Sequence, residues 1–543
     1  RTTKTKGGLA LNTIIKSPLA LAITAALTTT ALPAIAQDEA VNIVQSKCLA
    51  CHTEESSKAP QWSRISHQRK TPEGWLMTIG RMQMMHGLQI SDDERSAVVK
   101  YLADRQGLAP EETTDYRYAM ERRLDTMEVF DDSQLEEMCA RCHSGARVGL
   151  QRRPAAEWEH LVHFHLGQWP STEYQALARD RDWFPIALNE MVPKLTKMFP
   201  MDNDNWKQWQ AATKPDFVGE WSFAVHQPGR GDGRGVMKVE QQEADRYSVT
   251  VEGQWADGTP LKGFGSAIVY TGFEWRAQID LGGVQMRQVL AASKDGMNLS
   301  GRVFETAHDE RGMEFSAAKA TTGNSQIIAV YPQNLKAGES TEVTIVGSGL
   351  KGRVSLGKGV SVEKVLNRTY NSVTVLAKAA KGAKTSANGV SVGAVNGGQF
   401  AVYDKVDQIK VMPAFTIARV GGNGGSTPKV QARFEAEAWG AGADGKAGTE
   451  DDVRIGYLPA SWHVEPFDEA AKADNDVHFA GRMNAASGVF TPGNAGPNPE
   501  RRMSTNNAGN LKVVAQVQDG DQILTGDGQL IVTVQRWNDA PLP

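Results

Sequence analysis

The four cysteines of this 543-residue chain fall in two pairs, and a histidine directly follows each pair. The motifs are Cys48-Leu49-Ala50-Cys51-His52 and Cys139-Ala140-Arg141-Cys142-His143. Two thiols at this spacing can each form a thioether with one vinyl group of a porphyrin, and the adjacent imidazole can bind the iron. The sequence therefore predicts two c-type haems, with thioethers at Cys48, Cys51, Cys139 and Cys142 and proximal iron ligands at His52 and His143.

Three other uses of a Cys-X-X-Cys pair compete with haem attachment. A thioredoxin-like redox pair and a set of two disulfides both leave the repeated histidine without a role. Zinc is the strongest alternative, because two such pairs can supply four ligands. The two motifs are about 87 residues apart, however, which is wider than the spacing of ordinary zinc modules. Haem attachment accounts for all six residues.

An internal repeat after the motifs indicates the second axial ligand of each iron. Gln-Arg-Lys at 68–70 precedes Trp75, and Gln-Arg-Arg at 151–153 precedes Trp158. Aligning the tryptophans superposes Met82 on His165, and helical spacing puts both on the apolar face that each tryptophan begins. We therefore predict Met82 and His165 as the distal iron ligands. Methionine ligation raises the reduction potential, so electrons are expected to run from the second haem to the first.

Other residues compete for these distal positions. The methionine run around Met82 also fits flexible core packing. His67 and His86 compete with Met82 in the first unit, whereas His160 and His163 in the second unit fit solvated side chains. Basic residues also follow each motif and could pair with haem propionates, although a solvated basic turn explains them equally well. These are Arg69, Lys70, Arg152 and Arg153.

Helical segments are expected to position both motifs. Val41, Val44 and Cys48 share one face of a helix that leads into the first motif. A capping box at 91–94 predicts the start of a later helix, and a second box at 133–136 precedes Cys139. A charged linker helix is expected at 113–130. We predict an all-α di-haem cytochrome c domain at 37–212, in two units of about 37–110 and 130–212.

At about Pro215 the hydrophobic pattern changes to a period of two, with Gly-rich turns between the apolar runs. This pattern predicts three all-β domains: an antiparallel barrel-like domain at 216–320 and two immunoglobulin-like sandwiches at 325–403 and 405–543. An acidic loop, Asp444 to Asp452, fits either a calcium site or a polar surface loop. No catalytic triad or nucleotide-binding motif stands out in this β region.

The first 36 residues read as a secretory signal peptide. Four basic residues precede a short apolar run, and Ala34-Ile35-Ala36 forms a small-residue cleavage site. Export to the periplasm with cleavage near Ala36 is expected, which shifts the net charge from −4 to −8. The apolar run is too short to span a bilayer, and no later segment is long enough. The charge balance also excludes nucleic-acid binding by bulk positive charge.

The whole layout resembles the α subunit of quinohemoprotein amine dehydrogenase. The segments that carry the resemblance are QRKTPEGW, RMQMMHG and ADGKAGTEDDVRIG, together with the two haem motifs. The resemblance implies a di-haem subunit bound to a β-propeller subunit and to a small subunit that bears cysteine tryptophylquinone. It also implies oxidative deamination of primary amines, with electrons passing from the quinone through both haems to an external copper protein or cytochrome. All four cysteines serve the haem motifs, so none remains for a quinone crosslink.

Two other functions compete with this one. A free-standing di-haem electron carrier could use its β domains to dock to another periplasmic dehydrogenase. A di-haem peroxidase is disfavoured, because it needs an open iron and a calcium-linked activation for which the sequence offers little.

Overall fold

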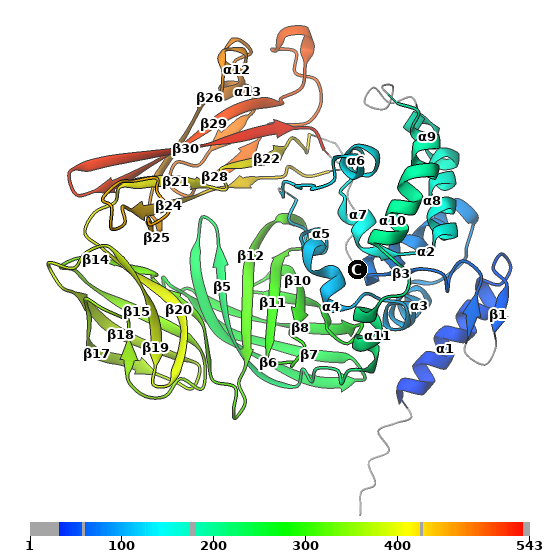
Figure 1. The fold of residues 1–543 in the computed structure, drawn as a ribbon, viewed down its shortest axis with the longest axis horizontal. Coiled ribbons are helices and arrows are strands. Elements are labelled where there is room, and N and C mark those ends of the chain that lie inside the picture. The colour runs from blue at the N-terminus through cyan, green and yellow to red at the C-terminus, as the bar shows by residue number, and fades with distance from the viewer. Residues whose placement is uncertain (1–31, 57–59, 125, 174–180, 424–426, 536–543) are drawn as a thin grey trace, which may run out of the picture.

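The computed structural model describes residues 32–56, 60–124, 126–173, 181–423 and 427–535. They form an N-terminal domain rich in helices, a closed β-barrel and two further β domains (Figure 1). Most of the predicted signal peptide lies outside the described residues. The backbone of the Ala34–Ala36 cleavage site falls within helix α1 (Leu32–Lys47).

The N-terminal domain contains eleven α-helices among its described residues, interspersed with 3-10 and π turns and four short strands. The α-helices are α1, α2 (Pro72–His86), α3 (Asp92–Arg105), α4 (Pro110–Thr113), α5 (Arg117–Met120), α6 (Ser133–Leu135), α7 (Ala146–Gly149), α8 (Ala155–Gln168), α9 (Trp183–Ile186), α10 (Val192–Met198) and α11 (Asp204–Ala211). The strands are β1 (Glu54–Ser56), β2 (Gln61–Trp62), β3 (Arg69–Lys70) and β4 (Gln151–Arg152). Because these strands pair, the prediction of an all-α domain is not confirmed.

Of the predicted helical features, the cap at 91–94 is confirmed, whereas the cap at 133–136 and the linker helix at 113–130 are wrong. Ser91 caps α3 as expected: its hydroxyl accepts from the Glu94 N–H at 3.2 Å, and the Glu94 carboxylate accepts from the Ser91 N–H at 2.8 Å. The cap predicted at Ser133 is wrong by one residue, because the Asp132 carboxylate accepts from the Leu135 N–H instead. The linker helix predicted at 113–130 is also wrong, since α5 ends at Met120 and no helix follows it among the described residues before α6.

Strands β3 and β4 join the two motif units. They pair antiparallel, with Arg69 opposite Arg152 and Lys70 opposite Gln151. Arg69 and Arg152 are equivalent positions of the two Gln-Arg-basic triplets, so this pair lies on the axis of a local two-fold arrangement. The sequence repeat is therefore also a spatial repeat.

Eight antiparallel strands close into the barrel in the order β10-β11-β12-β5-β6-β7-β8-β9. Their bounds are β5 (Gly219–Gln227), β6 (Gly231–Glu243), β7 (Arg246–Trp255), β8 (Pro260–Tyr270), β9 (Glu274–Leu281), β10 (Val284–Ala292), β11 (Asn298–Glu305) and β12 (His308–Lys319). Alternate side chains fill the barrel interior. Trp209 of α11 extends this core, and its indole N–H donates to the Thr271 carbonyl at 2.8 Å. The N-terminal domain is thus anchored on the barrel.

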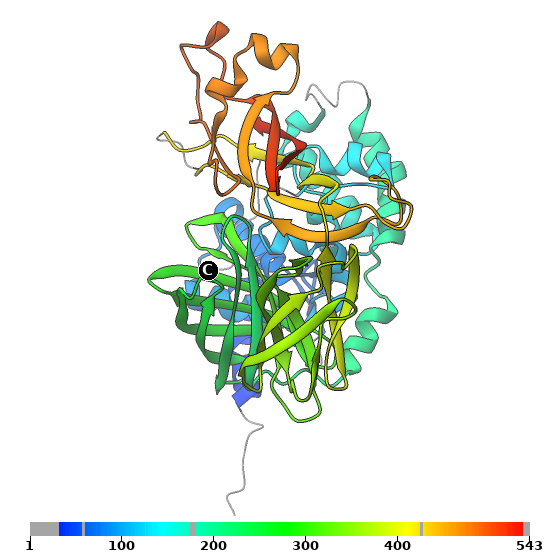
Figure 2. The same ribbon diagram turned by 90° about the vertical axis from the view of Figure 1, so that its left-hand side faces the viewer.

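Two β domains follow the barrel. Residues 326–403 form two four-stranded sheets whose inner faces share one apolar core. Their strands are β13 (Gln326–Tyr331), β15 (Ser340–Ser348), β18 (Ser372–Ala379) and β17 (Val360–Arg368) in one sheet, and β14 (Asn334–Lys336), β20 (Val395–Tyr403), β19 (Ser386–Val392) and β16 (Val354–Ser355) in the other. In two perpendicular views the C-terminal domain lies above both the barrel and this pair of sheets (Figures 1 and 2).

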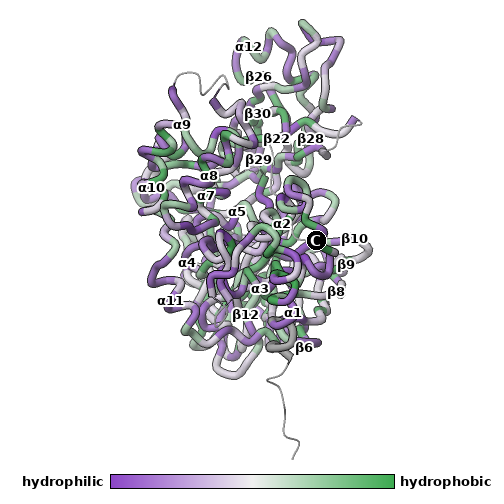
Figure 3. Tube along the Cα trace, turned by 90° about the vertical axis from the view of Figure 1, so that its right-hand side faces the viewer, coloured by the Kyte–Doolittle hydropathy of each residue, from purple (hydrophilic) through white to green (hydrophobic). Residues whose placement is uncertain are grey.

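The C-terminal domain has three sheets and two short helices, α12 (Glu469–Ala473) and α13 (Asp476–Phe479). The sheets contain β21 (Gln408–Met412), β24 (Glu435–Gly440) and β25 (Val453–Leu458); β22 (Phe415–Arg419), β30 (Gln522–Thr533), β29 (Gly509–Asp519) and β26 (Ser461–Pro466); and β23 (Ala432–Arg433), β28 (Val489–Pro492) and β27 (Gly481–Met483). Hydrophobic and hydrophilic residues are interspersed along the trace (Figure 3). In the described part of the chain no helix has the length and apolarity needed to cross a bilayer.

Candidate functional site

The first Cys-X-X-Cys-His motif forms a tight turn at the end of α1. The backbone N–H groups of Cys51 and His52 both donate to the Cys48 carbonyl, at 3.1 and 3.0 Å. The His52 Nδ1 lies 2.8 Å from the Ser63 carbonyl oxygen. Because a carbonyl can only accept, Nδ1 carries the proton and Nε2 keeps the lone pair that an iron would use. The turn therefore presents His52 in the tautomer that binds metal.

The second motif begins in a π-helical turn, Glu136–Ala140, which contains Cys139. Burial, aided by Asp132, raises the pKa of the Cys139 thiol to about 12, and burial also raises the pKa of Cys48. Burial thus favours the uncharged thiol at both positions. None of the four cysteines forms a disulfide, and the described residues contain no cluster of three or more groups suited to a metal ion.

His143 and His165 face each other in the second unit. Their ring centroids are 6.4 Å apart, and their planes are inclined at 45°. A metal–imidazole bond is about 2.1 Å and the nitrogen lies roughly 1.1 Å from its ring centre, so imidazoles on opposite sides of one iron have centroids roughly 6.4 Å apart. The observed spacing therefore fits one iron between these rings, as the prediction of His165 as a distal ligand requires.

The hydrogen bonds of this histidine pair also suit metal binding. The His143 Nδ1 donates to the Ser144 carbonyl at 3.0 Å, and the His165 Nδ1 donates to the Leu161 carbonyl at 2.7 Å. Burial, with the positive charges of nearby arginines, lowers the pKa of His165 despite its hydrogen bond to Leu161. His165 is therefore a neutral imidazole with its lone pair on Nε2, the form that ligates iron. His160 and His163 on the same helix are exposed, as expected of solvated side chains.

In the first unit, the contacts around the predicted distal ligand Met82 are fewer than those around His165. Trp75 and Ile79 of α2 pack in one apolar cluster with Cys48, as the predicted helix face requires. Met82 is half-buried on the same helix but does not join that cluster. The competing His67 is engaged by the Glu55 carboxylate at 2.9 Å, and His86 is exposed at the helix end. Met82 stays a prediction.

Buried polar atoms beside both motifs lack a partner. In the described residues, the Trp62 indole N–H and the Tyr101 hydroxyl are buried without a hydrogen bond in the cluster that contains Cys48. Among the described residues, the Trp158 indole N–H is also buried without a hydrogen bond, in the cluster that contains Cys139. Buried donors are normally satisfied, so these three fit a polar group that is not part of the polypeptide, such as a haem carboxylate. The residues present therefore fit two haems.

Comparison with known families agrees with this architecture. Four family models match successive parts of the chain: the haem-binding region of quinohemoprotein amine dehydrogenase alpha subunit at 38–206, and its domains II, III and IV at 215–320, 324–404 and 409–542.

The chain belongs to the quinohemoprotein amine dehydrogenase alpha-subunit family.

Other comparisons add little to this assignment. No curated protein matches the chain. A redesigned β-barrel, mFAP1 bound to DFHBI, is 13% identical over 19% of this chain and 93% of its own, with a TM-score of 0.17. Drosophila N-cadherin EC1-3 is 9% identical over 45% of this chain and 86% of its own, with a TM-score of 0.21. These TM-scores are low, so the two likenesses support no conclusion.

The basic triplets of this alpha-subunit chain require a correction. Arg69 and Arg152 are buried, and both bond to the Glu112 carboxylate: Arg69 through two bonds of 2.8 and 2.9 Å, and Arg152 Nε at 2.8 Å. The solvated turn is therefore wrong for these two arginines, and the carboxylate that they bind in this structure is that of Glu112. Glu112 escaped sequence reasoning because it lies 43 residues after Arg69 and no local pattern links the two.

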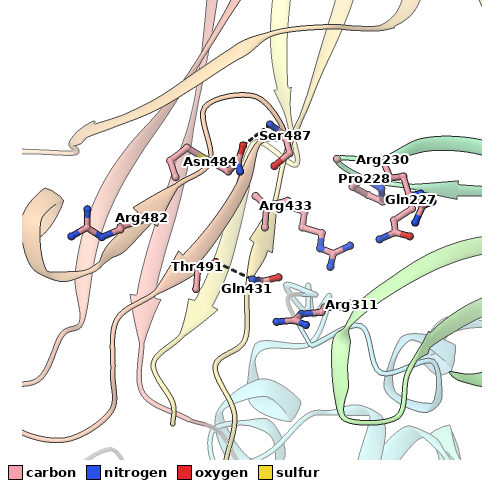
Figure 4. Close-up of a pocket in the computed structure, with 13 residues that line it drawn as sticks. Gln227, Pro228, Arg230, Arg311, Gln431, Arg433, Arg482, Asn484, Ser487 and Thr491 are labelled. Carbon is pink, nitrogen blue, oxygen red and sulfur yellow. Dashed lines mark hydrogen bonds between the residues drawn. The ribbon is translucent and has the colours of Figure 1, made fainter. Parts of the chain in front are cut away.

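The β domains of this alpha subunit contain no cysteine, so the Cys-X-X-Cys-His motifs have no counterpart there. The carboxylates of the acidic loop accept bonds from its own backbone, for example Asp452 from the Gly448 N–H at 2.7 Å. A cavity of about 620 Å³ lies between the barrel and the C-terminal domain (Figure 4). Its charged lining residues are Arg230, Arg311, Arg433 and Arg482, and no residue of either haem motif lines it.

Proposed function

We propose that this chain is the di-haem electron-transfer subunit of a periplasmic quinohaem amine dehydrogenase. The observation that carries the proposal is the facing pair of His143 and His165, whose spacing fits one iron, in a chain of this family. When bound, the two c-type haems supply reversible one-electron chemistry that links a quinone on a partner subunit to an external acceptor.

The chain's own residues attach and orient the two haems. Cys48 and Cys51 hold one haem, and Cys139 and Cys142 hold the other. The Nδ1 hydrogen bonds to the Ser63 and Ser144 carbonyls fix the ring orientation of His52 and His143 as proximal ligands. Met82 and His165 serve as the distal ligands. The apolar clusters around Cys48 and Cys139 keep water from the haem faces.

Substrate oxidation belongs, in this proposal, to other chains. Cysteine tryptophylquinone resides on a small subunit that assembles with a β-propeller subunit and with this chain. Primary amines are deaminated there, and a small copper protein or cytochrome accepts the electrons. In this assembly the domain at 326–403 is the immunoglobulin-like sandwich, whereas the C-terminal domain, which was also predicted to be a sandwich, has three sheets. The signal peptide directs the chain to the periplasm, with cleavage near Ala36.

Purification of the native protein tests this function. The samples are analysed by subunit mass, by haem staining and by redox-cycling staining for quinones after denaturing electrophoresis. A stable complex with two haems on this chain and a quinone on a small peptide is the expected result. An isolated chain that stains only for haem would overturn the proposal in favour of a free-standing di-haem carrier.

A further inference from the structure

The cavity between the barrel and the C-terminal domain has a lining whose charged side chains are all arginines. One wall is the turn between β5 and β6, at 227–230, together with Arg311 of β12. The other wall comes from β23, β27, β28 and the turn that joins the last two strands. The polar lining side chains without charge are Gln227, Gln431, Asn484, Ser487 and Thr491. Among the described residues, none of the side chains that line the cavity is acidic.

Two contacts hold the walls of this cavity together. Gly229 has a φ of 81°, and a Cβ built on it would lie 2.9 Å from the Ser487 carbonyl oxygen, so the barrel turn meets the C-terminal domain at its backbone. His226 directly precedes the turn, and its Nε2 lies 2.8 Å from the carboxylate of Glu435, two residues after Arg433. Direct contacts between the two domains therefore fix the walls in place.

An aromatic ring orients Arg230 at the barrel wall. The Arg230 guanidinium lies 4.1 Å from the centre of the Trp255 ring, which is itself buried in the barrel core. In the part of the chain that the structure describes, no carboxylate lies within salt-bridge distance of Arg230. A guanidinium that stacks through its face keeps the N–H groups of its edge for hydrogen bonds. Arg230 is thus arranged to donate to an oxyanion.

Arg311 and Arg433 approach the cavity from different domains. The ion pairs of Arg311 are long, because its Nη1 lies 3.5 Å from the Glu305 carboxylate and its Nε lies 3.9 Å from the Glu310 carboxylate. Charge-assisted hydrogen bonds are shorter, about 2.7–2.9 Å. Figure 4 shows the Arg433 side chain extending from β23 toward Arg311. We name Arg230, Arg311 and Arg433 the arginine cleft.

We propose that the arginine cleft binds a small molecule with two or more oxyanion groups, either phosphate or carboxylate, which joins the barrel to the C-terminal domain. Arginine binds such groups through paired, charge-assisted hydrogen bonds. The cavity volume of about 620 Å³ lies within the range of roughly 300–1,000 Å³ that small-molecule sites occupy. Arg482 also lines the cavity but extends away from the other three arginines in Figure 4, so it is not part of the site. Neither haem motif contributes a lining residue, so the inference is independent of the proposed electron transfer.

Isothermal titration calorimetry of the purified full chain in low-salt buffer tests this inference. Sodium pyrophosphate and sodium citrate are titrated separately, as the phosphate probe and the carboxylate probe. We expect one site per chain for at least one probe, and the tighter probe identifies the preferred group. Arg230→Gln should weaken that binding about tenfold, since it removes charge-assisted hydrogen bonds. Arg246→Gln, which removes an exposed arginine at the opposite end of β6 from the cleft, is the matched control and should leave binding unchanged.

Thermal unfolding supplies a second measurement on the same variants. A ligand that binds only the folded chain raises Tm as its concentration rises. The Tm of wild type should therefore rise with probe concentration, and those of Arg230→Gln and Arg311→Gln should rise less. Arg230→Lys keeps the charge but not the planar fork, and it should bind with intermediate affinity. The inference is overturned if neither probe binds wild type at concentrations up to about 10 mM, or if both glutamine variants bind as tightly as wild type.

Discussion

His143 and His165 present their imidazoles to each other at a centroid distance of 6.4 Å, although 22 residues separate them in the chain. Each Nδ1 is bonded to a backbone carbonyl, so both rings are held in the tautomer whose Nε2 can bind iron. The spacing fits one iron between the two rings, as the prediction of His165 as a distal ligand requires, and it leads directly to the first prediction.

His165→Ala should remove one axial ligand from the second haem alone. We expect about half of the low-spin iron to become high-spin, because one of two irons loses a ligand. Visible absorption and electron paramagnetic resonance measure the change. His160→Ala, on the exposed face of the same helix, is the control and should leave the spectra unchanged. An unaltered spectrum for His165→Ala contradicts the ligand assignment.

Met82→Ala should change the first haem and spare the second. Thioether ligation favours reduced iron, so its loss should lower the midpoint potential of one haem by about 59 mV or more, a tenfold shift in equilibrium. A redox titration checks this. Met84→Ala, at a side chain that is 78% exposed, serves as the control. If His67→Ala rather than Met82→Ala moves the potential, His67 is the ligand.

Replacing both cysteines of the second motif should halve the covalent haem. The Cys139→Ser and Cys142→Ser double variant loses both thioethers of one haem and keeps those at Cys48 and Cys51. Haem staining after denaturing electrophoresis should fall to about half of the wild-type signal per chain. A full wild-type signal would show that the second motif does not attach haem.

Glu112→Gln should destabilise the junction between the two units. Burial tends to raise the pKa of Glu112, but the bonds and charges of Arg69 and Arg152 outweigh it, so the pKa is lowered and the group is a carboxylate. Removing its charge leaves two buried guanidinium groups without compensation, which should cost about 3–5 kcal/mol of unfolding free energy. Denaturant titration measures this. Glu111→Gln, the more exposed neighbouring glutamate that pairs with Lys294, should cost less than about 0.5 kcal/mol.

His226 should make the contact between the barrel and the C-terminal domain sensitive to alkaline pH. Burial lowers the pKa of His226, but bonds of 2.8 Å to Asp232 and to Glu435 outweigh burial and raise the pKa to about 10. The stabilisation that the His226 imidazolium contributes is complete below pH 6.5, the ordinary pKa of histidine. It is lost as the pH rises through the folded-state pKa of about 10.

The matching variant is His226→Gln, compared with wild type by thermal unfolding across that pH range. The unfolding free energy of His226→Gln should be lower than that of wild type by about 1–3 kcal/mol near pH 6.5, a range reduced for solvent screening. The difference should shrink as the pH approaches 10. A difference that stays constant with pH would mean that the imidazolium charge does not stabilise the contact.

Sequence patterns predicted a helix cap correctly where no neighbouring residue could take over the capping role. The Ser91 capping box formed because the serine hydroxyl and the Glu94 carboxylate satisfy each other within a single turn. At the second motif, Asp132 took the capping role from Ser133, since a carboxylate one residue earlier reaches the same kind of free N–H. The predicted linker helix does not form as one continuous helix, and tertiary contacts explain why. Arg117 pairs with Glu274 of the barrel, and Arg122 pairs with Asp309 of the barrel.

The sequence by itself was enough to predict haem attachment, because a Cys-X-X-Cys-His motif places its ligands within five residues and needs no distant partner. It also determined the class of the downstream domains, since a period of two follows from strand geometry alone. Only the tertiary structure decided which side chains complete the sites. It placed the ring of His165 near that of His143, and it placed the Glu112 carboxylate within hydrogen-bond distance of both Arg69 and Arg152. Burial and charge compensation are summed over residues distant in sequence, so no local spacing encodes them.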